Sequence, residues 1–210
     1  MTPAVALKSK RRTQPQRRAA MRERLLEATV ECLHELGFNG TTTIEVARRA
    51  GVSRGAQLHH YPTRQKLVVA AIEHVLQKRL GEFRRGFSVQ QGKGDRTRRA
   101  VELLWSLTNG STFYAWLELL VAARTDPELR TAMLSIAQRF EQGVLEAFHE
   151  AFPENRDNPA LNFAPWFTLA SLQGFALDRI LDPREPRVEI GLQILTSMGR
   201  QAFTPKAGKR

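Results

Sequence analysis

The stretch of residues 42–61 constrains the fold more than any other part of this chain, because it encodes two short helices joined by a tight turn. Thr42 and Glu45 have the spacing of a capping box, in which each side chain accepts a hydrogen bond from the other residue's backbone N–H. Gly51 supplies the left-handed residue that commonly ends a helix, and Ser53 is a good N-cap for the second helix. The first helix has one apolar face of small residues, which lets another helix pack closely: Val46, Ala47 and Ala50.

A helix, a glycine-containing turn and a second helix form the helix-turn-helix of many DNA readers. The alternative is an ordinary helical hairpin inside a bundle. The chemistry of the second helix favours DNA, because no acidic residue occurs between Glu45 and Glu73 and because Gly55 and Ala56 are small enough to approach a groove wall. The side chains available to contact the groove are Arg54, Gln57, His59 and His60.

The same segment resembles the DNA-binding module of the TetR family of bacterial transcriptional regulators over residues 19–79. The resemblance rests on several positions in one fixed register: Ala47, Ala50-Gly51-Val52-Ser53, Gly55, His60-Tyr61, Thr63-Arg64 and Leu67. It implies an all-α fold of about nine helices, in which a three-helix N-terminal helix-turn-helix domain is followed by an α-helical ligand-binding and dimerisation bundle.

The chain departs from the family pattern at Gln57 and Leu58, where the family usually has an apolar residue followed by Tyr. We expect Leu58 to pack inward, while Gln57 either donates to a base edge or faces the core. A basic residue at the position of Arg64 contacts a phosphate in the family, so the resemblance gives that role to Arg64. The complete set of predicted DNA contacts is Thr42, Thr43, Ser53, Arg54, Gly55, Ala56, Gln57, His59, His60 and Arg64.

The formal net charge of +11 indicates a polyanionic partner. Seven basic residues precede the first acidic one: Lys8, Lys10, Arg11, Arg12, Arg17, Arg18 and Arg22. We expect residues 1–18 to form a disordered arm that follows the DNA backbone or enters a minor groove, with a solubilising tail as the alternative. Residues 205–210 form a second basic tail.

Other functional classes find little support in the sequence. No apolar run approaches the ~20 residues that span a bilayer. Cys32 is the only cysteine, which fits a reducing bacterial cytoplasm, and we interpret it as a packed thiol rather than a redox sensor. No nucleophile, metal-ligand or phosphate-loop motif indicates an enzyme. We therefore expect a cytoplasmic, nucleoid-associated protein without cofactor, metal or membrane partner.

The remaining periodicity is helical, with a Gly-rich loop at residues 86–96. We expect a domain boundary between residues 79 and 80, and the second domain to end at residue 204. The expected helices outside the central motif span residues 15–36, 64–83, 96–109, 112–124, 126–152, 160–181 and 186–203. Residues 112–124 are apolar around most of the helix, so we expect that helix to be buried.

Aromatic residues in the C-terminal half suggest a pocket for an apolar or aromatic ligand, although aromatic residues at helical spacing more often belong to a core. The candidate ligand contacts are Trp105, Phe113, Trp116, Phe140, Phe167 and Phe175. The resemblance places a dimer contact on the last two helices, the alternative being a helix crossing within one subunit. The candidate dimer residues are Phe167, Ala170, Ser171, Gly174, Leu177, Ile194 and Met198.

These observations together predict a sequence-specific regulator that binds a near-palindromic operator in double-stranded DNA as a homodimer. Repression, the common case in the family, would be relieved by an unidentified small-molecule effector that moves the helix beginning at Arg64. The main alternative is a sequence-tolerant architectural DNA-binding protein without an effector.

Overall fold

The computed structural model describes residues 13–88 and 95–203, and every element within them is helical. This confirms the all-α expectation. The α-helices are α1 (Gln14–Gly40), α2 (Thr43–Ala50), α3 (Arg54–His60), α4 (Arg64–Ser88), α5 (Arg96–Leu107), α6 (Ser111–Ala123), α7 (Pro127–Ala151), α8 (Ala164–Leu181) and α9 (Pro186–Phe203). Two short 3₁₀ helices, Pro153–Asn155 and Leu161–Phe163, connect α7 to α8.

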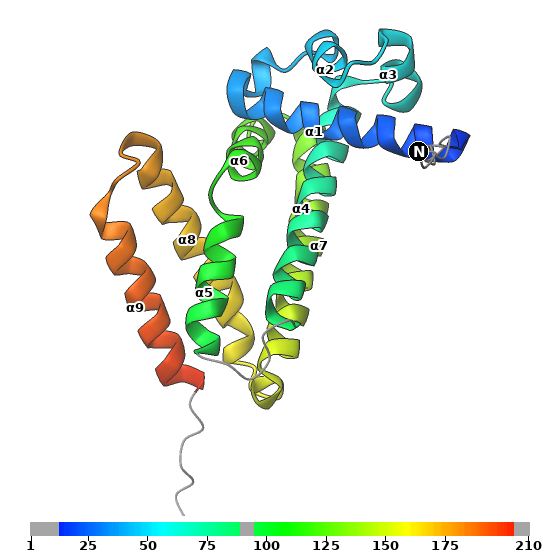
Figure 1. The fold of residues 1–210 in the computed structure, drawn as a ribbon. Coiled ribbons are helices and arrows are strands. Elements are labelled where there is room, and N and C mark those ends of the chain that lie inside the picture. The colour runs from blue at the N-terminus through cyan, green and yellow to red at the C-terminus, as the bar shows by residue number, and fades with distance from the viewer. Residues whose placement is uncertain (1–12, 89–94, 204–210) are drawn as a thin grey trace, which may run out of the picture.

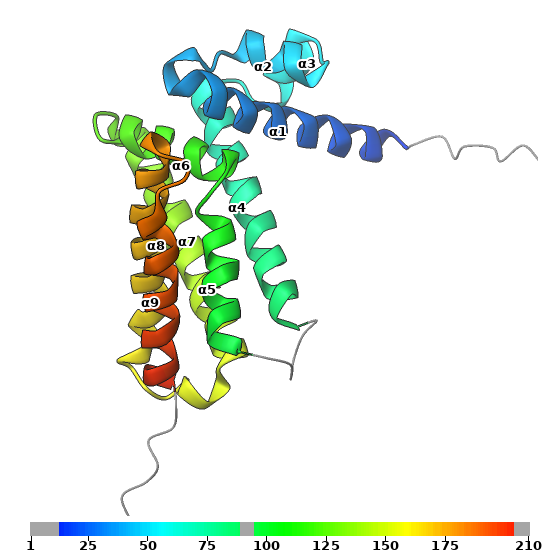
Figure 2. The same ribbon diagram turned by 60° about the vertical axis from the view of Figure 1, so that its left-hand side comes forward.

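The helices form two levels, with α1 lying across one end of a bundle of longer helices (Figure 1). The short helices α2 and α3 lie on the far side of α1 from the bundle. In the bundle, α4 packs along α7, and α5 packs against α8 and α9 (Figures 1 and 2). The helix-turn-helix therefore occupies one end of the molecule, where its outer surface faces solvent.

Two hydrophobic clusters form the core, one where the two levels meet and one within the bundle. The cluster nearer the helix-turn-helix joins residues of α1, α2 and α4 to Ala115 and Leu119 of α6 and to Leu129 of α7. The other combines the end of α4 with α5, α7, α8 and α9. Helices α1 and α2 thus share their core with the bundle, and the boundary expected at residues 79/80 falls within α4.

The start of α1 corrects the predicted extent of the basic arm. Thr13 and Gln16 form a capping box, in which the Thr13 N–H donates to Gln16 Oε1 at 2.9 Å and the Gln16 N–H donates to Thr13 Oγ1 at 3.4 Å. Residues 14–18 are consequently helical rather than disordered. The rest of the arm, residues 1–12, and the expected tail at 205–210 lie outside the described residues.

A kink at Gly37 brings the end of α1 into contact with α6. Gly37 has φ +69° and ψ 177°, a combination that favours glycine because it has no Cβ. The Phe38 N–H then donates to Glu118 Oε2 of α6 at 2.7 Å. This charge-assisted hydrogen bond joins residues that are far apart in the sequence. It lies where the three N-terminal helices α1–α3, here called the reader, meet the bundle.

Two expectations about individual segments are wrong. Leu120 and Val121 of α6 are exposed, because α1, α4 and α7 cover only part of this helix. The predicted loop at residues 86–96 is shorter at its start, since α4 continues to Ser88.

Cys32 is fully buried, and this burial raises the pKa of its thiol, as expected for a packed cysteine. Within residues 13–88 and 95–203, no helix combines the length and the apolarity needed to cross a membrane.

Replacing Glu118 tests the junction between α1 and α6. Glu118→Ala should lower the free energy of unfolding by about 1.5–3 kcal/mol, because the half-buried Phe38 N–H loses a charged acceptor. Chemical denaturation of both proteins measures this difference. Glu150→Ala, at an exposed position in α7, is the matched control and should leave stability nearly unchanged. Equal effects of the two substitutions would contradict the importance assigned to this hydrogen bond.

Candidate DNA-binding surface

The α2–turn–α3 unit forms through the local signals present in its sequence. Thr42 Oγ1 accepts from the Glu45 N–H at 3.2 Å, and Ser53 Oγ accepts from the Ala56 N–H at 3.2 Å. Gly51 takes the left-handed conformation at φ 62° and ψ 41°. These caps confirm where the two helices begin and where the first one ends.

The second half of the predicted capping box is wrong. The Glu45 carboxylate accepts from Arg48 Nε at 2.8 Å and from Arg49 Nε at 2.8 Å instead of from the Thr42 N–H. These hydrogen bonds lower the pKa of Glu45 to about 2. Arg49 also donates to Glu35 of α1 at 2.6 Å, so the cluster ties α2 to α1.

The outward face of α3 consists of Arg54, Gly55, Leu58 and His59, all of them exposed. These residues share one side because positions separated by three or four residues are neighbours on a helix. Among the other predicted contacts, Thr42 and Ser53 are exposed, whereas Thr43, Ala56 and His60 are half-buried.

Gln57 faces the core, which contradicts its predicted contact with DNA. Its side chain is 0% exposed, and Nε2 donates to the Tyr61 carbonyl at 2.7 Å. Gln57 Oε1 is buried with no hydrogen-bond partner in the described part of the chain. Leu58, expected inside, is 41% exposed. Successive helical residues differ by about 100° in direction, so turning Gln57 inward turns Leu58 outward.

Arg64 is directed to α1, contrary to the predicted contact with a DNA phosphate. Its Nε donates to the Thr41 carbonyl at 2.6 Å, and Nη2 donates to the Phe38 carbonyl. The guanidinium also lies over the Phe38 ring, 4.0 Å from its centre. Carbonyls at the end of a helix lack helical partners and carry partial negative charge, which explains why they attract this cation.

Two arginines of α1 extend positive charge toward α3. Arg22 Nε donates to Tyr61 Oη at 3.5 Å. The pKa of His60 is lowered, first by burial and then by His59, Arg22 and Arg18. Arg18 therefore lies in α1 and not in the disordered arm expected for residues 1–18. Its four-residue separation from Arg22 is the sequence signal that both lie on one face of a helix.

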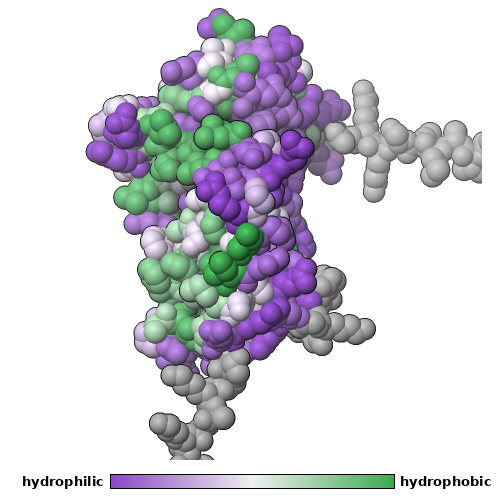
Figure 3. Space-filling model, turned by 90° about the vertical axis from the view of Figure 1, so that its left-hand side faces the viewer, coloured by the Kyte–Doolittle hydropathy of each residue, from purple (hydrophilic) through white to green (hydrophobic). Residues whose placement is uncertain are grey.

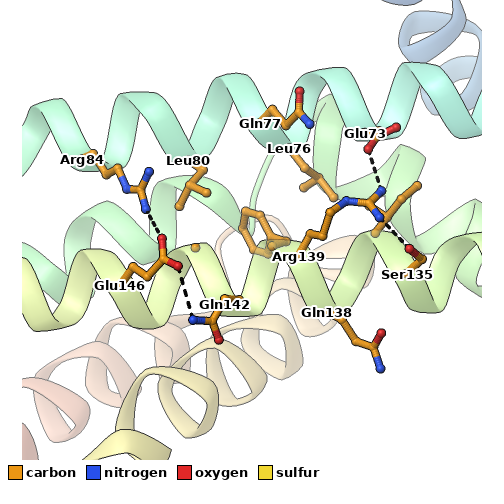
Figure 4. A pocket seen from close by; sticks show the side chains of 13 residues that line it. Glu73, Leu76, Gln77, Leu80, Arg84, Ser135, Gln138, Arg139, Gln142 and Glu146 are labelled. Carbon is orange, nitrogen blue, oxygen red and sulfur yellow. Dashed lines mark hydrogen bonds and ion pairs between the residues drawn. The ribbon is translucent and has the colours of Figure 1, made fainter.

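A cleft between α4 and α7 has a volume of about 510 Å³. Figure 4 shows Leu76 and Leu80 between two ion pairs that join the helices. Arg139 lies 2.6 Å from Glu73, and Arg84 lies 2.7 Å from Glu146. The cleft is therefore apolar in its middle and charged at its rim.

Four of the six candidate ligand residues line cavities. Phe113, Trp116 and Phe140 line a cavity of about 50 Å³, and Phe140 also lines the α4–α7 cleft. Phe167 lines a third cavity of about 160 Å³ at the far end of the bundle. Trp105 and Phe175 line none of these three. Trp105 instead lies 5.2 Å from the Arg179 guanidinium, and the Phe175 ring occupies the space beside Gly191 of α9.

The candidate dimer residues lie on an outward face of α8 and α9. Large apolar side chains of these two helices are exposed: Phe167, Leu177, Ile180, Leu181, Ile190, Ile194 and Met198. Figure 3 views the molecule from this side and shows hydrophobic surface gathered on it. Ser171 is half-buried and donates to the Phe167 carbonyl at 2.9 Å.

Gly174 itself does not lie at a close helix crossing within the subunit. A Cβ added at Gly174 would meet nothing within 4 Å. The close approach between α8 and α9 occurs at Gly191, where an added Cβ would lie 2.4 Å from the Phe175 ring.

Comparisons with known proteins agree with this arrangement. Residues 25–71 match the family model described as "Bacterial regulatory proteins, tetR family". The chain is similar to an uncharacterized HTH-type transcriptional regulator of Mycobacterium tuberculosis, with 31% identity over 148 residues that cover 68% of this chain and 76% of the relative.

Two solved structures have the same fold. A transcriptional regulator of Pseudomonas aeruginosa has a TM-score of 0.67 and 22% identity, with 92% of this chain and 93% of that one covered. FadR of Bacillus subtilis, solved in complex with stearoyl-CoA, has a TM-score of 0.63 and 14% identity, with 83% and 97% covered.

The inward position of Gln57 predicts the effect of its removal. Gln57→Ala should lower the free energy of unfolding by about 1–3 kcal/mol, because it opens a cavity and leaves the Tyr61 carbonyl without its donor. It should leave the preferred DNA sequence unchanged. His59→Ala, on the exposed face of α3, is the counterpart and should leave stability nearly unchanged. Denaturation and DNA selection with both variants measure these effects, and unchanged stability with altered base preference in Gln57→Ala would contradict the assignment.

Proposed function

The chain belongs to the TetR family of DNA-binding transcriptional regulators, and on that premise we propose that it is a repressor that binds a near-palindromic operator as a homodimer. A small apolar or aromatic ligand would release it from DNA. The protein would act in the bacterial cytoplasm, at the nucleoid.

The observation that carries this proposal is the exposed face of α3 at the end of the molecule. Arg54 and His59 offer hydrogen-bond donors there, and Gly55 has no side chain to keep the helix away from a groove wall. Arg18 and Arg22 place further positive charge near the end of α3, where they can contact the phosphate backbone.

Dimerisation is proposed from the apolar face of α8 and α9. Monomeric proteins rarely expose contiguous apolar surface on this scale, and such a patch commonly marks an interface. One reading helix covers only a few base pairs. Two copies related by a two-fold axis would read two half-sites about 34–36 Å apart, or a multiple of that distance.

Release by a ligand is proposed from the position of α6 between the cavities and the reader. One side of α6 contributes Phe113 and Trp116 to the cavity of about 50 Å³. Another side contacts α1, where Glu118 accepts from the Phe38 N–H and the Tyr114 ring stacks on His34 at 5.3 Å. A displacement of α6 would therefore move α1 and, with it, the helix-turn-helix. We propose that α6 has the role expected from the sequence for the helix that begins at Arg64.

The α4–α7 cleft offers this ligand a route to α6. Leu76 and Phe140 line both the cleft and the cavity of about 50 Å³, so these two spaces adjoin. The volume of the cleft, about 510 Å³, lies within the usual range for small-molecule sites. Coupling of this kind typically changes DNA affinity by about 1–3 kcal/mol.

Selection from a random duplex library tests the proposed function. The full-length protein should enrich a near-palindrome and remain bound to it at moderate salt, while binding to scrambled duplex should disappear. Recovery of no common sequence, with binding that salt erases on every duplex, would contradict sequence-specific regulation. That result would favour an architectural DNA-binding protein.

A charged substitution on the apolar face tests the dimer. Leu177→Arg should yield monomers and weaken operator binding at least tenfold, because a buried and unpaired charge costs about 3–5 kcal/mol. Sedimentation velocity and gel shift measure the two effects. Leu134→Arg, at a similarly exposed leucine of α7, is the matched control and should stay dimeric. A dimeric Leu177→Arg protein would contradict the assigned interface.

A further inference from the structure

Leu58 is the apolar member of the outward face of α3. Its side chain is 41% exposed, and its neighbours on that face are Arg54, Gly55 and His59. An isolated leucine on a protein surface needs no special explanation. Leu58 differs because it lies at the centre of the face that the proposed function directs into the major groove.

The side chains around Leu58 leave it accessible from outside. A helical side chain leans over the preceding turn, which for Leu58 contains Arg54 and Gly55. Gly55 has no Cβ, and a Cβ added there would meet nothing within 4 Å. The isobutyl group of Leu58 therefore projects from α3 without a neighbouring side chain on its Gly55 side.

The major groove offers one apolar partner to such a group. Base edges there present hydrogen-bond donors and acceptors, and thymine alone adds a C5-methyl group. Leu58 has no hydrogen-bonding atom in its side chain and cannot satisfy the polar edges of guanine, cytosine or adenine. Contact with a thymine methyl would remove apolar surface of both groups from water.

We propose that Leu58 is a specificity-determining residue that reads a thymine C5-methyl group in each operator half-site. This inference rests on the proposed function, since it requires α3 to enter the major groove. Arg54 and His59 supply the polar contacts on either side, and Gln57 makes no contribution to base choice because it is buried.

Deoxyuridine replacement tests the proposal on the duplex obtained by selection. Deoxyuridine lacks the C5-methyl group of thymidine and keeps the same hydrogen-bonding edges. Each thymidine of the selected duplex is replaced singly, then together with its symmetry-related partner. Dissociation constants are measured for the wild type, Leu58→Ala, Leu58→Met and Leu134→Ala, and thermal unfolding verifies that each variant is folded.

One symmetry-related pair of thymidines should stand out. Loss of one methyl should weaken wild-type binding about 4-fold, and loss of both about 15-fold, as expected for burial of one methyl group in each half-site. Leu58→Ala should bind the thymidine and deoxyuridine duplexes equally well at these positions. Leu58→Met keeps an apolar side chain and should retain the difference, and Leu134→Ala should behave as the wild type.

Two results would overturn the inference while leaving sequence-specific binding intact. The first is a wild-type protein that tolerates deoxyuridine at every position. The second is an equal deoxyuridine penalty in the wild type and Leu58→Ala, since the methyl would then contact another residue. If selection enriches no duplex at all, the proposed function fails, and the assignment of Leu58 falls with it.

Discussion

The packing of α6 against α1 is the contact on which the rest of the structure depends. Ala115 and Leu119 of α6 are fully buried in the cluster that also contains the core of the reading helices. The kink at Gly37 allows the Phe38 N–H to reach Glu118 beside this cluster. Because α1 supports α2 and α3 on its opposite side, the orientation of the reader follows from how α6 holds α1 (Figure 1).

This arrangement gives the bundle a physical means of acting on DNA. The reader has no separate core, so a change in the position of α6 must be accommodated by α1, α2 and α4 together. Close-packed interiors transmit such shifts because they contain few voids to absorb them. Phe113 and Trp116 of α6 line a cavity, and the same helix contacts α1. The proposed coupling between ligand and DNA therefore passes through α6 alone before it reaches α1.

The sequence predicted those features of the reader that local interactions determine. Gly51 and Ser53 act within one turn of their own helices, so their roles could be read without knowledge of the fold. Thr13 and Gln16 carry an equally local signal, a capping box at the start of α1, within the segment that the sequence analysis assigns to the arm.

Local sequence alone could not predict that the Gln57 side chain points into the core and the Leu58 side chain points outward. In a helix as short as α3, polarity suggests which side faces DNA, yet here an amide is buried and a leucine exposed. The partner of Gln57, the Tyr61 carbonyl, is only four residues away, but which side of α3 is buried depends on how the helix packs on the rest of the fold. Arg64 bonds carbonyls near the end of α1, which are more than twenty residues earlier in the sequence.

The sequence shows where the aromatic residues of the bundle are, but it does not show which of them line a cavity and which belong to the packed core. Phe113 and Phe175 both lie in apolar helical stretches, but Phe113 borders one of the cavities described above, whereas Phe175 occupies the space beside Gly191 of α9. That difference depends on how α8 and α9 cross, which no local pattern specifies.

A crystal structure of the full-length protein bound to its selected duplex tests the central claim, the outward direction of this α3 face, most directly. The account predicts α3 in the major groove, with Arg54, Leu58 and His59 against the bases and phosphates and Gln57 still bonded to the Tyr61 carbonyl. A complex in which Gln57 reaches a base edge while Leu58 packs inside, or in which α3 lies outside the groove, would contradict it.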